Sequence, residues 1–156
     1  YNLNAIDALK DFKLNNGRSE EIDINGVKTI INLAKNPTGA NVSLRMLNED
    51  KEEKELLFVL NDNPADGLDV SWIYDINFET VNVKRIITSG KRAYDMAIRI
   101  KTSFFDKDNI EAYLSIEEAV KSLYSSDVKK YVIANYTALQ PTRKALLEYK
   151  KETKKE

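Results

Sequence analysis

The sequence predicts an α/β fold: a doubly wound, mostly parallel sheet of about six strands with one antiparallel edge strand, of the Rossmann-like kind. Short apolar runs alternate along the chain with segments of helical periodicity. The runs are continuous rather than alternating, which is typical of strands that helices cover on both faces. Asn25-Gly26, between two β-rich runs, favours a type I′ hairpin turn and supplies the antiparallel strand.

The boundaries of the elements follow from apolar periodicity and capping residues. A first helix is expected over 4–12, and a hairpin over 21–33. Strands are expected at 29–33, 56–60, 85–88, 111–114 and 130–134, and helices at 40–49, 91–102, 115–125 and 139–152. Ser115 and Glu118 form a capping-box pattern before an apolar stripe. Asn41 or Thr38 is expected to cap the helix that begins near residue 40.

Composition limits the functions open to the chain. Its 156 residues fit one domain, and a net charge of −1 gives no electrostatic argument for binding nucleic acid or an anionic membrane. No apolar stretch approaches the roughly 20 residues that a transmembrane helix needs. Without cysteine or histidine the chain has neither a thiolate nor an imidazole, and we expect no metal site.

The most informative segment is the polar loop Asn61–Asp69, directly after the apolar run 56–60. Loops at the ends of strands are where α/β proteins carry their chemistry. The carboxyl ends of parallel strands share one edge of the sheet. This loop should therefore meet the polar segments 34–39 and 135–137 at that edge.

The aspartates of the loop, Asp62, Asp66 and Asp69, admit two interpretations. They can be turn and cap residues of a solvated loop, or the loop can hold one carboxylate in place for a function. Trp72 and Tyr74 follow directly and offer the amphipathic surface of a protein interface. A lone aspartate can orient and charge-stabilise a histidine, as in nucleophilic triads. Here that histidine would have to come from a partner.

Familiar phosphate and calcium motifs do not fit. Gly90-Lys91-Arg92 resembles the end of a P-loop but lacks its first glycine and its Ser or Thr. The aspartate loop has a proline at a ligand position of an EF-hand. The segment Lys35-Asn36-Pro37 is either a plain strand-to-helix turn or a place where helix amides and Lys35 face an anion such as a nucleotide phosphate.

Three ordered motifs carry a family resemblance: Ile31-Asn32-Leu33-Ala34-Lys35-Asn36-Pro37-Thr38-Gly39, Leu60-Asn61-Asp62-Asn63 with Ala65-Asp66-Gly67, and Asp69-Val70-Ser71-Trp72-Ile73-Tyr74-Asp75. Together they resemble the MurT family, the Mur-ligase-like subunits of bacterial lipid II isoglutaminyl synthases, and specifically their carboxy-terminal domain. The resemblance implies three parts: residues 1–16 as the end of a central ATPase domain, 17–149 as a Mur ligase C-terminal-like domain, and 150–156 as a charged tail.

The resemblance also implies a role in peptidoglycan synthesis. Such a subunit uses ATP and Mg²⁺ to activate the α-carboxylate of D-glutamate in the lipid II stem peptide. A GatD-type glutamine amidotransferase subunit supplies ammonia, which converts D-glutamate to D-isoglutamine. That partner has a Cys and a His but lacks the third triad member, which an aspartate of the ligase subunit is expected to supply. By motif position Asp69 is the match, and Asp66 and Asp75 are the alternatives.

Further positions follow from the same resemblance. Residues expected at the partner interface are Asp66, Trp72, Tyr74 and Asp75. Residues expected along a nucleotide cleft are Arg18, Asn32, Lys35 and Asn36. The P-loop of the full subunit is absent from this sequence, so no ATP is expected on this chain alone. The expected location is the bacterial cytoplasm, at the inner face of the membrane that holds the lipid-linked substrate.

Two other functions stay open at this stage. The loop can serve only to dock a partner; then Trp72→Ala should abolish association, while Asp69→Asn should leave catalysis intact. Alternatively, the chain can be an independent nucleotide- or phosphate-binding module, which calorimetry with ATP would detect.

Overall fold

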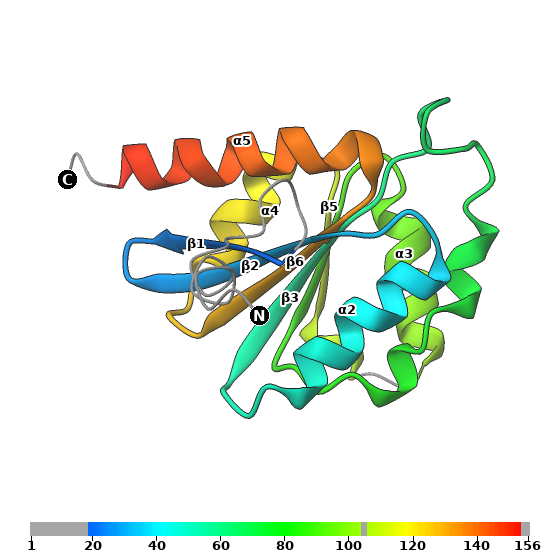
Figure 1. Ribbon diagram of the computed structural model, residues 1–156, viewed down its shortest axis with the longest axis horizontal. Coiled ribbons are helices and arrows are strands. Elements are labelled where there is room, and N and C mark those ends of the chain that lie inside the picture. The colour runs from blue at the N-terminus through cyan, green and yellow to red at the C-terminus, as the bar shows by residue number, and fades with distance from the viewer. Residues whose placement is uncertain (1–18, 104–105, 154–156) are drawn as a thin grey trace, which may run out of the picture.

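The computed structural model describes residues 19–103 and 106–153 (Figure 1). The helix predicted over 4–12, the segment 1–16 and Arg18 lie outside the described residues. Within the described part of the chain, no helix is long and apolar enough to cross a membrane.

Six strands form one sheet in the order β1-β2-β6-β3-β4-β5. Their bounds are β1 Glu20–Ile24, β2 Val27–Leu33, β3 Lys54–Val59, β4 Ile86–Ser89, β5 Ile110–Tyr113 and β6 Lys129–Ala134. β1 pairs with β2 antiparallel, and every other neighbouring pair is parallel. Asn25 and Gly26 form the hairpin turn with φ values of 54° and 86°. The predicted fold class, a mostly parallel sheet with one antiparallel edge strand, is confirmed.

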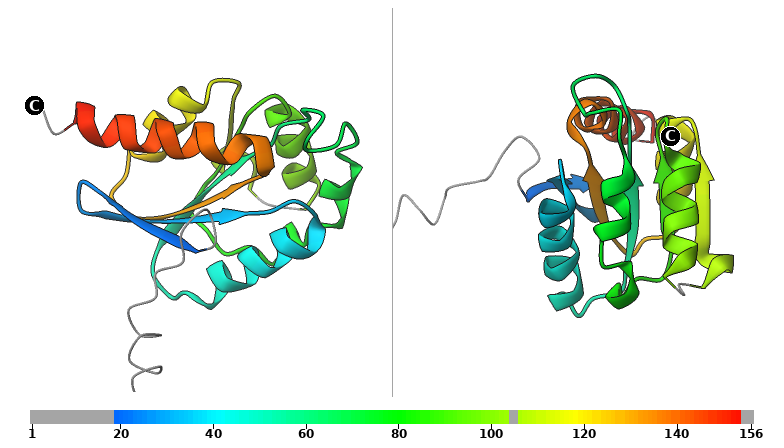
Figure 2. Two further views of the ribbon diagram at one scale, coloured as in Figure 1. Left: turned by 45° about the horizontal axis from the view of Figure 1, so that its top comes forward. Right: turned by 90° about the vertical axis from the view of Figure 1, so that its right-hand side faces the viewer.

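Helices cover both faces of this sheet, as Figures 1 and 2 show. One face carries α2 (Pro37–Glu49), α3 (Ala93–Thr102) and two short 3₁₀ helices, η1 (Ser71–Asp75) and η2 (Phe78–Thr80). The other face carries α4 (Ile116–Leu123) and α5 (Tyr136–Glu152). A further 3₁₀ turn, η3 (Lys107–Asn109), precedes β5.

The sheet separates two apolar cores, and the central strand β3 contributes to both. Phe58 packs in the core under α2 and α3, while Leu57 and Val59 pack in the core under α4 and α5. All six positions of β3 are buried. The four positions 56–59 are apolar, because a strand that is covered on both faces has no solvent side for polar residues, whereas Lys54 and Glu55 at its start are charged and buried.

Several predicted boundaries were wrong, and local chemistry explains the error at α2. α2 begins at Pro37 rather than near residue 40, because proline fits the first helical position. Its N-cap is Asn36, whose side chain accepts the Gly39 amide at 2.9 Å, and not the predicted Asn41 or Thr38. α3 begins at Ala93 instead of residue 91.

The carboxy-terminal helix also differs from its prediction. α5 begins at Tyr136 rather than residue 139, so the predicted polar loop 135–137 is in part the first helical turn. It ends at Glu152, as predicted for the helix, and so includes the first residues of the segment 150–156 that was predicted as a charged tail. The capping residue of α4 is as predicted, since the Ser115 hydroxyl accepts the Glu118 amide at 3.2 Å.

Candidate functional site

The loop that follows β3 is fixed to the start of α5 through its main chain. The side chain of Asn135 accepts the Asn61 amide at 3.1 Å and donates to the Asn61 carbonyl at 2.7 Å. Asn135 is 3% exposed. A side-chain amide that pairs with both main-chain groups of one residue imitates a strand neighbour. The hydrogen-bond pattern of the sheet therefore continues to Asn61, the first residue of the loop.

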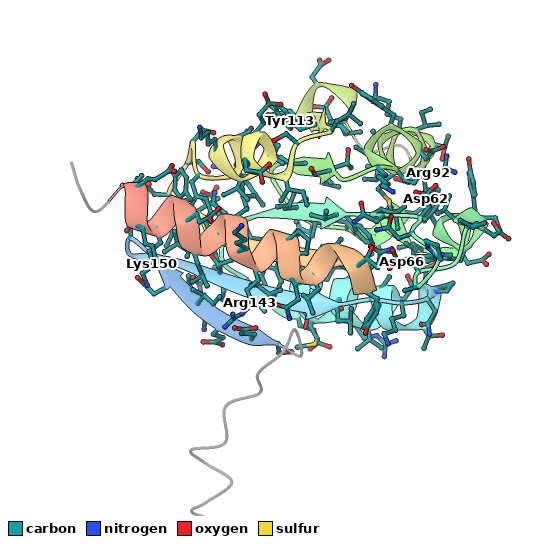
Figure 3. All side chains as sticks on the ribbon, turned by 90° about the horizontal axis from the view of Figure 1, so that it is seen from above. Asp62, Asp66, Arg92, Tyr113, Arg143 and Lys150 are labelled. Atoms are coloured by element: carbon teal, nitrogen blue, oxygen red, sulfur yellow. The ribbon has the colours of Figure 1, made fainter. Side chains whose placement is uncertain are left out.

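Asp66 makes a second contact with α5. Its carboxylate accepts the Thr137 amide at 2.8 Å and also the Thr137 hydroxyl. Figure 3 shows Asp66 beside the start of this helix. The first amides of a helix have no partner within the helix, and the side chain of Asn135 is already bound to Asn61. Asp66 therefore does for α5 what a capping residue ordinarily does, and its charge suits the positive end of the helix dipole.

The junction between β4 and α3 forms a third contact with the loop. The Lys91 amide donates to Asn61 Oδ1 at 3.1 Å, and Lys91 Nζ donates to Asn63 Oδ1 at 2.6 Å. Arg92 Nε bonds Asp62 Oδ2 at 2.8 Å (Figure 3). The first part of the loop is thus bound to two different strand-to-helix junctions.

These contacts confirm that the segments 62–69 and 135–137 meet at the carboxyl edge of the sheet. The segment 34–39 joins them, because Lys35 Nζ lies 4.5 Å from the centre of the Tyr136 ring. A lysine over an aromatic face is held by the ring quadrupole. The loop rises at this edge above the ends of α2, η1 and α3 (Figure 2, right).

Gly90 allows the close approach of the β4–α3 junction to the loop. Its φ is +90°, and a Cβ at this position would lie 2.6 Å from the Leu60 carbonyl oxygen and 2.8 Å from Asn61 Oδ1. Gly67, within the loop, has a similar φ of +87° but no atom within 4 Å of such a Cβ. Alanine at Gly67 would therefore strain only the backbone, whereas alanine at Gly90 would also overlap with neighbouring atoms.

We expect Gly90→Ala to lower the free energy of unfolding by about 2–4 kcal/mol, because a strained φ and a steric overlap add. Gly67→Ala should lower the free energy of unfolding by only about 1–2 kcal/mol, since only its positive φ is unfavourable for alanine. Urea denaturation of both variants measures the difference. Equal losses would show that the approach of Gly90 to Leu60 is not tight.

Asp69 is an exposed residue at the carboxyl end of the loop. Its Oδ1 accepts the Ser71 amide at 2.8 Å, and this hydrogen bond lowers the pKa of Asp69 below that of an ordinary aspartate. The carboxylate is therefore ionised at neutral pH and sits at the start of η1. An ionised, exposed and backbone-anchored carboxylate is suited to receive a hydrogen bond from a group on another molecule.

The other two aspartates considered for this role have different surroundings. Asp66 is turned toward Thr137, so its carboxylate is already a double acceptor within the chain. Asp75 is exposed, and its main-chain carbonyl accepts Asn41 Nδ2 at 3.0 Å. Of the three carboxylates, that of Asp69 combines exposure with anchoring by a main-chain amide.

The apolar surface near Asp69 consists of two exposed side chains and a half-buried one. Leu68 is 71% exposed and Tyr74 is 61% exposed. Trp72, which the sequence suggested as the main contact residue, is only partly exposed and packs against the core under α2 and α3. Sequence reasoning did not single out Leu68, because a lone leucine in a polar loop has no local signal.

The described residues predicted along a nucleotide cleft have different surroundings, and Arg18 lies outside the described residues. Asn32 is 6% exposed and its Oδ1 accepts the Ser19 amide at 2.9 Å. The side chain of Asn36 is used as the cap of α2. Lys35 is exposed beside Tyr136. The role of these residues along a nucleotide cleft stays a prediction.

Within residues 19–103 and 106–153, no group of three or more acidic residues could hold a metal ion. Among the residues predicted for the cleft, the available contributions are the exposed Lys35 and the buried Asn32 Nδ2, which has no hydrogen-bond partner in the described part of the chain.

Solved structures with the same fold are ligases. A folylpolyglutamate synthase from Thermotoga maritima matches with a TM-score of 0.64 and 23% identity, over 93% of this chain and 34% of that protein. MurF from Acinetobacter baumannii matches with a TM-score of 0.67 and 14% identity, over 94% of this chain and 33% of that protein. The fold is thus that of the carboxy-terminal domain of Mur-type ligases.

The family within this class follows from sequence comparison. Residues 33–139 match the family described as MurT ligase C-terminal, and the chain belongs to that family. The chain is 36% identical, over 133 residues, to the lipid II isoglutaminyl synthase (glutamine-hydrolyzing) subunit MurT of Staphylococcus aureus (strain COL), covering 81% of this chain and 29% of that protein. Against the Streptococcus pneumoniae (strain R6) subunit it is 31% identical over 134 residues, covering 83% and 30%. The chain thus spans less than a third of the length of these relatives.

Proposed function

We propose that this chain is the carboxy-terminal domain of the ligase subunit of a lipid II isoglutaminyl synthase. In this proposal the domain docks a GatD-type glutamine amidotransferase subunit and lends it Asp69 as the acidic member of a Cys–His–Asp triad. Amidation of D-glutamate in lipid II, the use of ATP and Mg²⁺, and action at the cytoplasmic face of the membrane belong to the whole subunit and are part of the same proposal.

The observation that carries the proposal is the state of Asp69. It is an ionised, exposed carboxylate at the carboxyl end of the loop, anchored by the Ser71 amide, in a chain with no histidine. A carboxylate in a triad holds the imidazole in one tautomer and stabilises the imidazolium that forms. Both tasks need a fixed, charged and accessible group, and the surroundings of Asp69 provide these three properties.

Leu68 and Tyr74 support the docking part of the proposal, because exposed apolar and aromatic side chains beside a functional group are typical of interface centres. The rival in which the chain binds nucleotide by itself has less support, because the side chain of Asn36 already caps α2 and Asn32 is buried. Calorimetry of the isolated chain with ATP tests that rival, and we expect no tight binding.

The test of the proposal is glutamine hydrolysis by the complex of full-length subunits with Asp69→Asn. Slow hydrolysis with normal association supports the triad role. Normal hydrolysis would show that Asp69 is not part of the triad, and docking would then be the function of the loop.

We also expect Tyr74→Ala to weaken association with the amidotransferase subunit at least about tenfold, because a well-placed interface tyrosine contributes more than about 1 kcal/mol. Tyr74 is a better probe than Trp72, whose replacement would also remove packing from the core. Tyr94 on α3, 56% exposed, is the matched control and should leave the affinity unchanged. Titration of labelled subunits measures both, and an equal loss at the two tyrosines would contradict this placement of the interface.

A further inference from the structure

The loop that carries Asp69 is fixed on both sides of this residue. On the carboxyl side, Asn41 donates to the Asp75 carbonyl at 3.0 Å and accepts the Asn77 amide at 2.8 Å. Arg99 NH2 donates to the Ile76 carbonyl at 2.6 Å. These contacts come from α2 and α3, and they hold η1 against the two helices.

On the amino side, Thr137 is the nearest fixed point to Asp69. Its amide and hydroxyl both donate to the Asp66 carboxylate, and its Oγ1 accepts Asn63 Nδ2 at 2.7 Å. Asn61 Nδ2 lies 3.4 Å from the same oxygen. One hydroxyl therefore joins three loop side chains to the start of α5.

Asp66, which Thr137 holds, is separated from Asp69 by Gly67 and Leu68 alone. The segment before them is a tight turn, in which the Asp66 amide donates to the Asn63 carbonyl at 2.8 Å. Gly67 has the φ of +87° that favours glycine, and Leu68 is 71% exposed. If Asp66 were released from Thr137, the path of this stretch on the amino side would depend on the hydrogen bonds of the turn, which include the Gly67 amide to the Pro64 carbonyl at 3.4 Å.

We propose that Thr137 is a positioning residue for Asp69, acting through the carboxylate of Asp66. This inference rests on the proposed function of Asp69. Catalytic geometry is sensitive to small displacements, and a misplacement of about 1 Å can cost about 100-fold in rate. Asp66 is thus assigned to holding the loop in place rather than to direct contact with the reacting groups.

The alternative is that the Asp66–Thr137 pair only caps α5. A cap contributes to stability, about 0.5–2 kcal/mol, and its loss lowers the amount of folded protein without changing the turnover of the folded fraction. Kinetic readouts on intact complex, normalised to the amount of assembled protein, separate the two roles.

The experiment uses the complex of full-length subunits and three replacements on α5. Thr137→Val keeps the branched shape and the amide but removes the hydroxyl. Thr137→Ser keeps the hydroxyl and should restore function. Thr142→Val is the matched control, because the Thr142 hydroxyl donates to the Ala138 carbonyl within the helix at 2.8 Å and does not touch the loop.

We expect Thr137→Val to lower kcat for glutamine hydrolysis about tenfold, with KM and partner affinity near their normal values. Thr137→Ser and Thr142→Val should stay within about twofold of the unchanged complex. In an Asp69→Asn background, Thr137→Val should cause no further loss, because residues that act through one another are not additive.

The pH profile of kcat/KM gives a second readout. A nearby carboxylate raises the pKa of an imidazole, so a displaced Asp69 should lower the pKa of the partner's histidine. Thr137→Val should therefore move the acid limb of the profile toward lower pH, in the direction that Asp69→Asn moves it. A purely structural cap would leave the acid limb in place.

The outcomes distinguish the two proposals. If Asp69→Asn hydrolyses glutamine normally, the proposed function is wrong, and the inference fails with it. If Asp69→Asn is slow but Thr137→Val is normal, only the positioning role is overturned. An equal further loss from Thr137→Val in the Asp69→Asn background, or a loss that appears only as weaker association, also overturns it.

Discussion

Replacing Asp69 by asparagine should lower glutamine hydrolysis by the full complex about 10²- to 10⁴-fold, the range that a triad carboxylate and its general base contribute. Asparagine keeps an oxygen for the Ser71 amide, so the loop should hold its course. The negative charge is lost, however, and the side-chain amide can present a donor where the imidazole needs an acceptor. The loss should appear in kcat, because the charge acts when the imidazolium forms.

Two measurements make this result specific. Asp75→Asn, six residues further on and also exposed, is the matched control and should retain normal hydrolysis. Association of the two subunits should be unchanged in both variants. A loss at Asp75 with normal activity at Asp69 would move the role to the alternative carboxylate, and losses at neither would leave the loop with docking alone.

The second large effect concerns stability and arises at the opposite edge of the sheet. Glu55, at the start of β3, accepts Lys130 Nζ at 2.7 Å and Arg85 NH2 at 3.0 Å. The Lys130 side chain is 0% exposed and that of Glu55 is 6% exposed. Burial raises the pKa of Glu55, but the hydrogen bonds and charges of Arg85 and Lys130 outweigh it, and the net pKa is lowered.

Glu55→Gln should lower the free energy of unfolding by about 3–5 kcal/mol, because it leaves two cations near each other in a buried site with less negative charge. Glutamine has the same shape, so the loss reports charge rather than packing. Glu53→Gln is the control: its pair with Lys84, at 3.0 Å, joins two exposed side chains and should contribute less than about 1 kcal/mol. Urea denaturation at pH 7 measures both, and equal losses would contradict the importance of burial.

The difference between the original protein and Glu55→Gln should depend on pH. The folded state lowers the pKa of Glu55, so its contribution is complete above the ordinary glutamate pKa and is lost as the pH falls through the lowered value. The two proteins should therefore differ most near neutral pH, and the difference should shrink as the pH falls below the ordinary glutamate pKa of about 4.3 toward the lowered value. A constant difference across this range would show that the charge of Glu55 is not the cause.

Residues at this opposite edge show why strand ends are hard to predict. The sequence places the start of the third strand at residue 56, because Lys54 and Glu55 are charged and resemble a solvated end. The structure begins β3 at Lys54 and buries both residues. Lys54 finds its partners in nearby main-chain carbonyls, and Glu55 finds them in distant parts of the chain. Lys54 Nζ donates to the Asp50 carbonyl at 2.6 Å, while Glu55 binds cations of two neighbouring strand segments.

The two 3₁₀ helices after the loop were also not predicted. Ser71–Asp75 and Phe78–Thr80 lack the length for a periodic signal, and their positions depend on Asn41, Asn48 and Arg99. Asn41 was one of two residues expected to cap α2. In the structure it instead bonds the main chain of Asp75 and Asn77. The role of such a polar residue depends on the segment that packs beside it.

The sequence by itself determined the fold class, the hairpin, most of the strands and the motif that includes Asp69, because periodicity, turn chemistry and motif order are local properties of the chain. Only the tertiary structure decided which aspartate turns inward and which stays exposed. Asp66 meets Thr137 across 71 positions and Asn61 meets Asn135 across 74, and such pairs form only when the parallel strands bring their carboxyl ends together. No local property of the aspartates distinguishes Asp66, which bonds Thr137, from Asp69, which stays exposed.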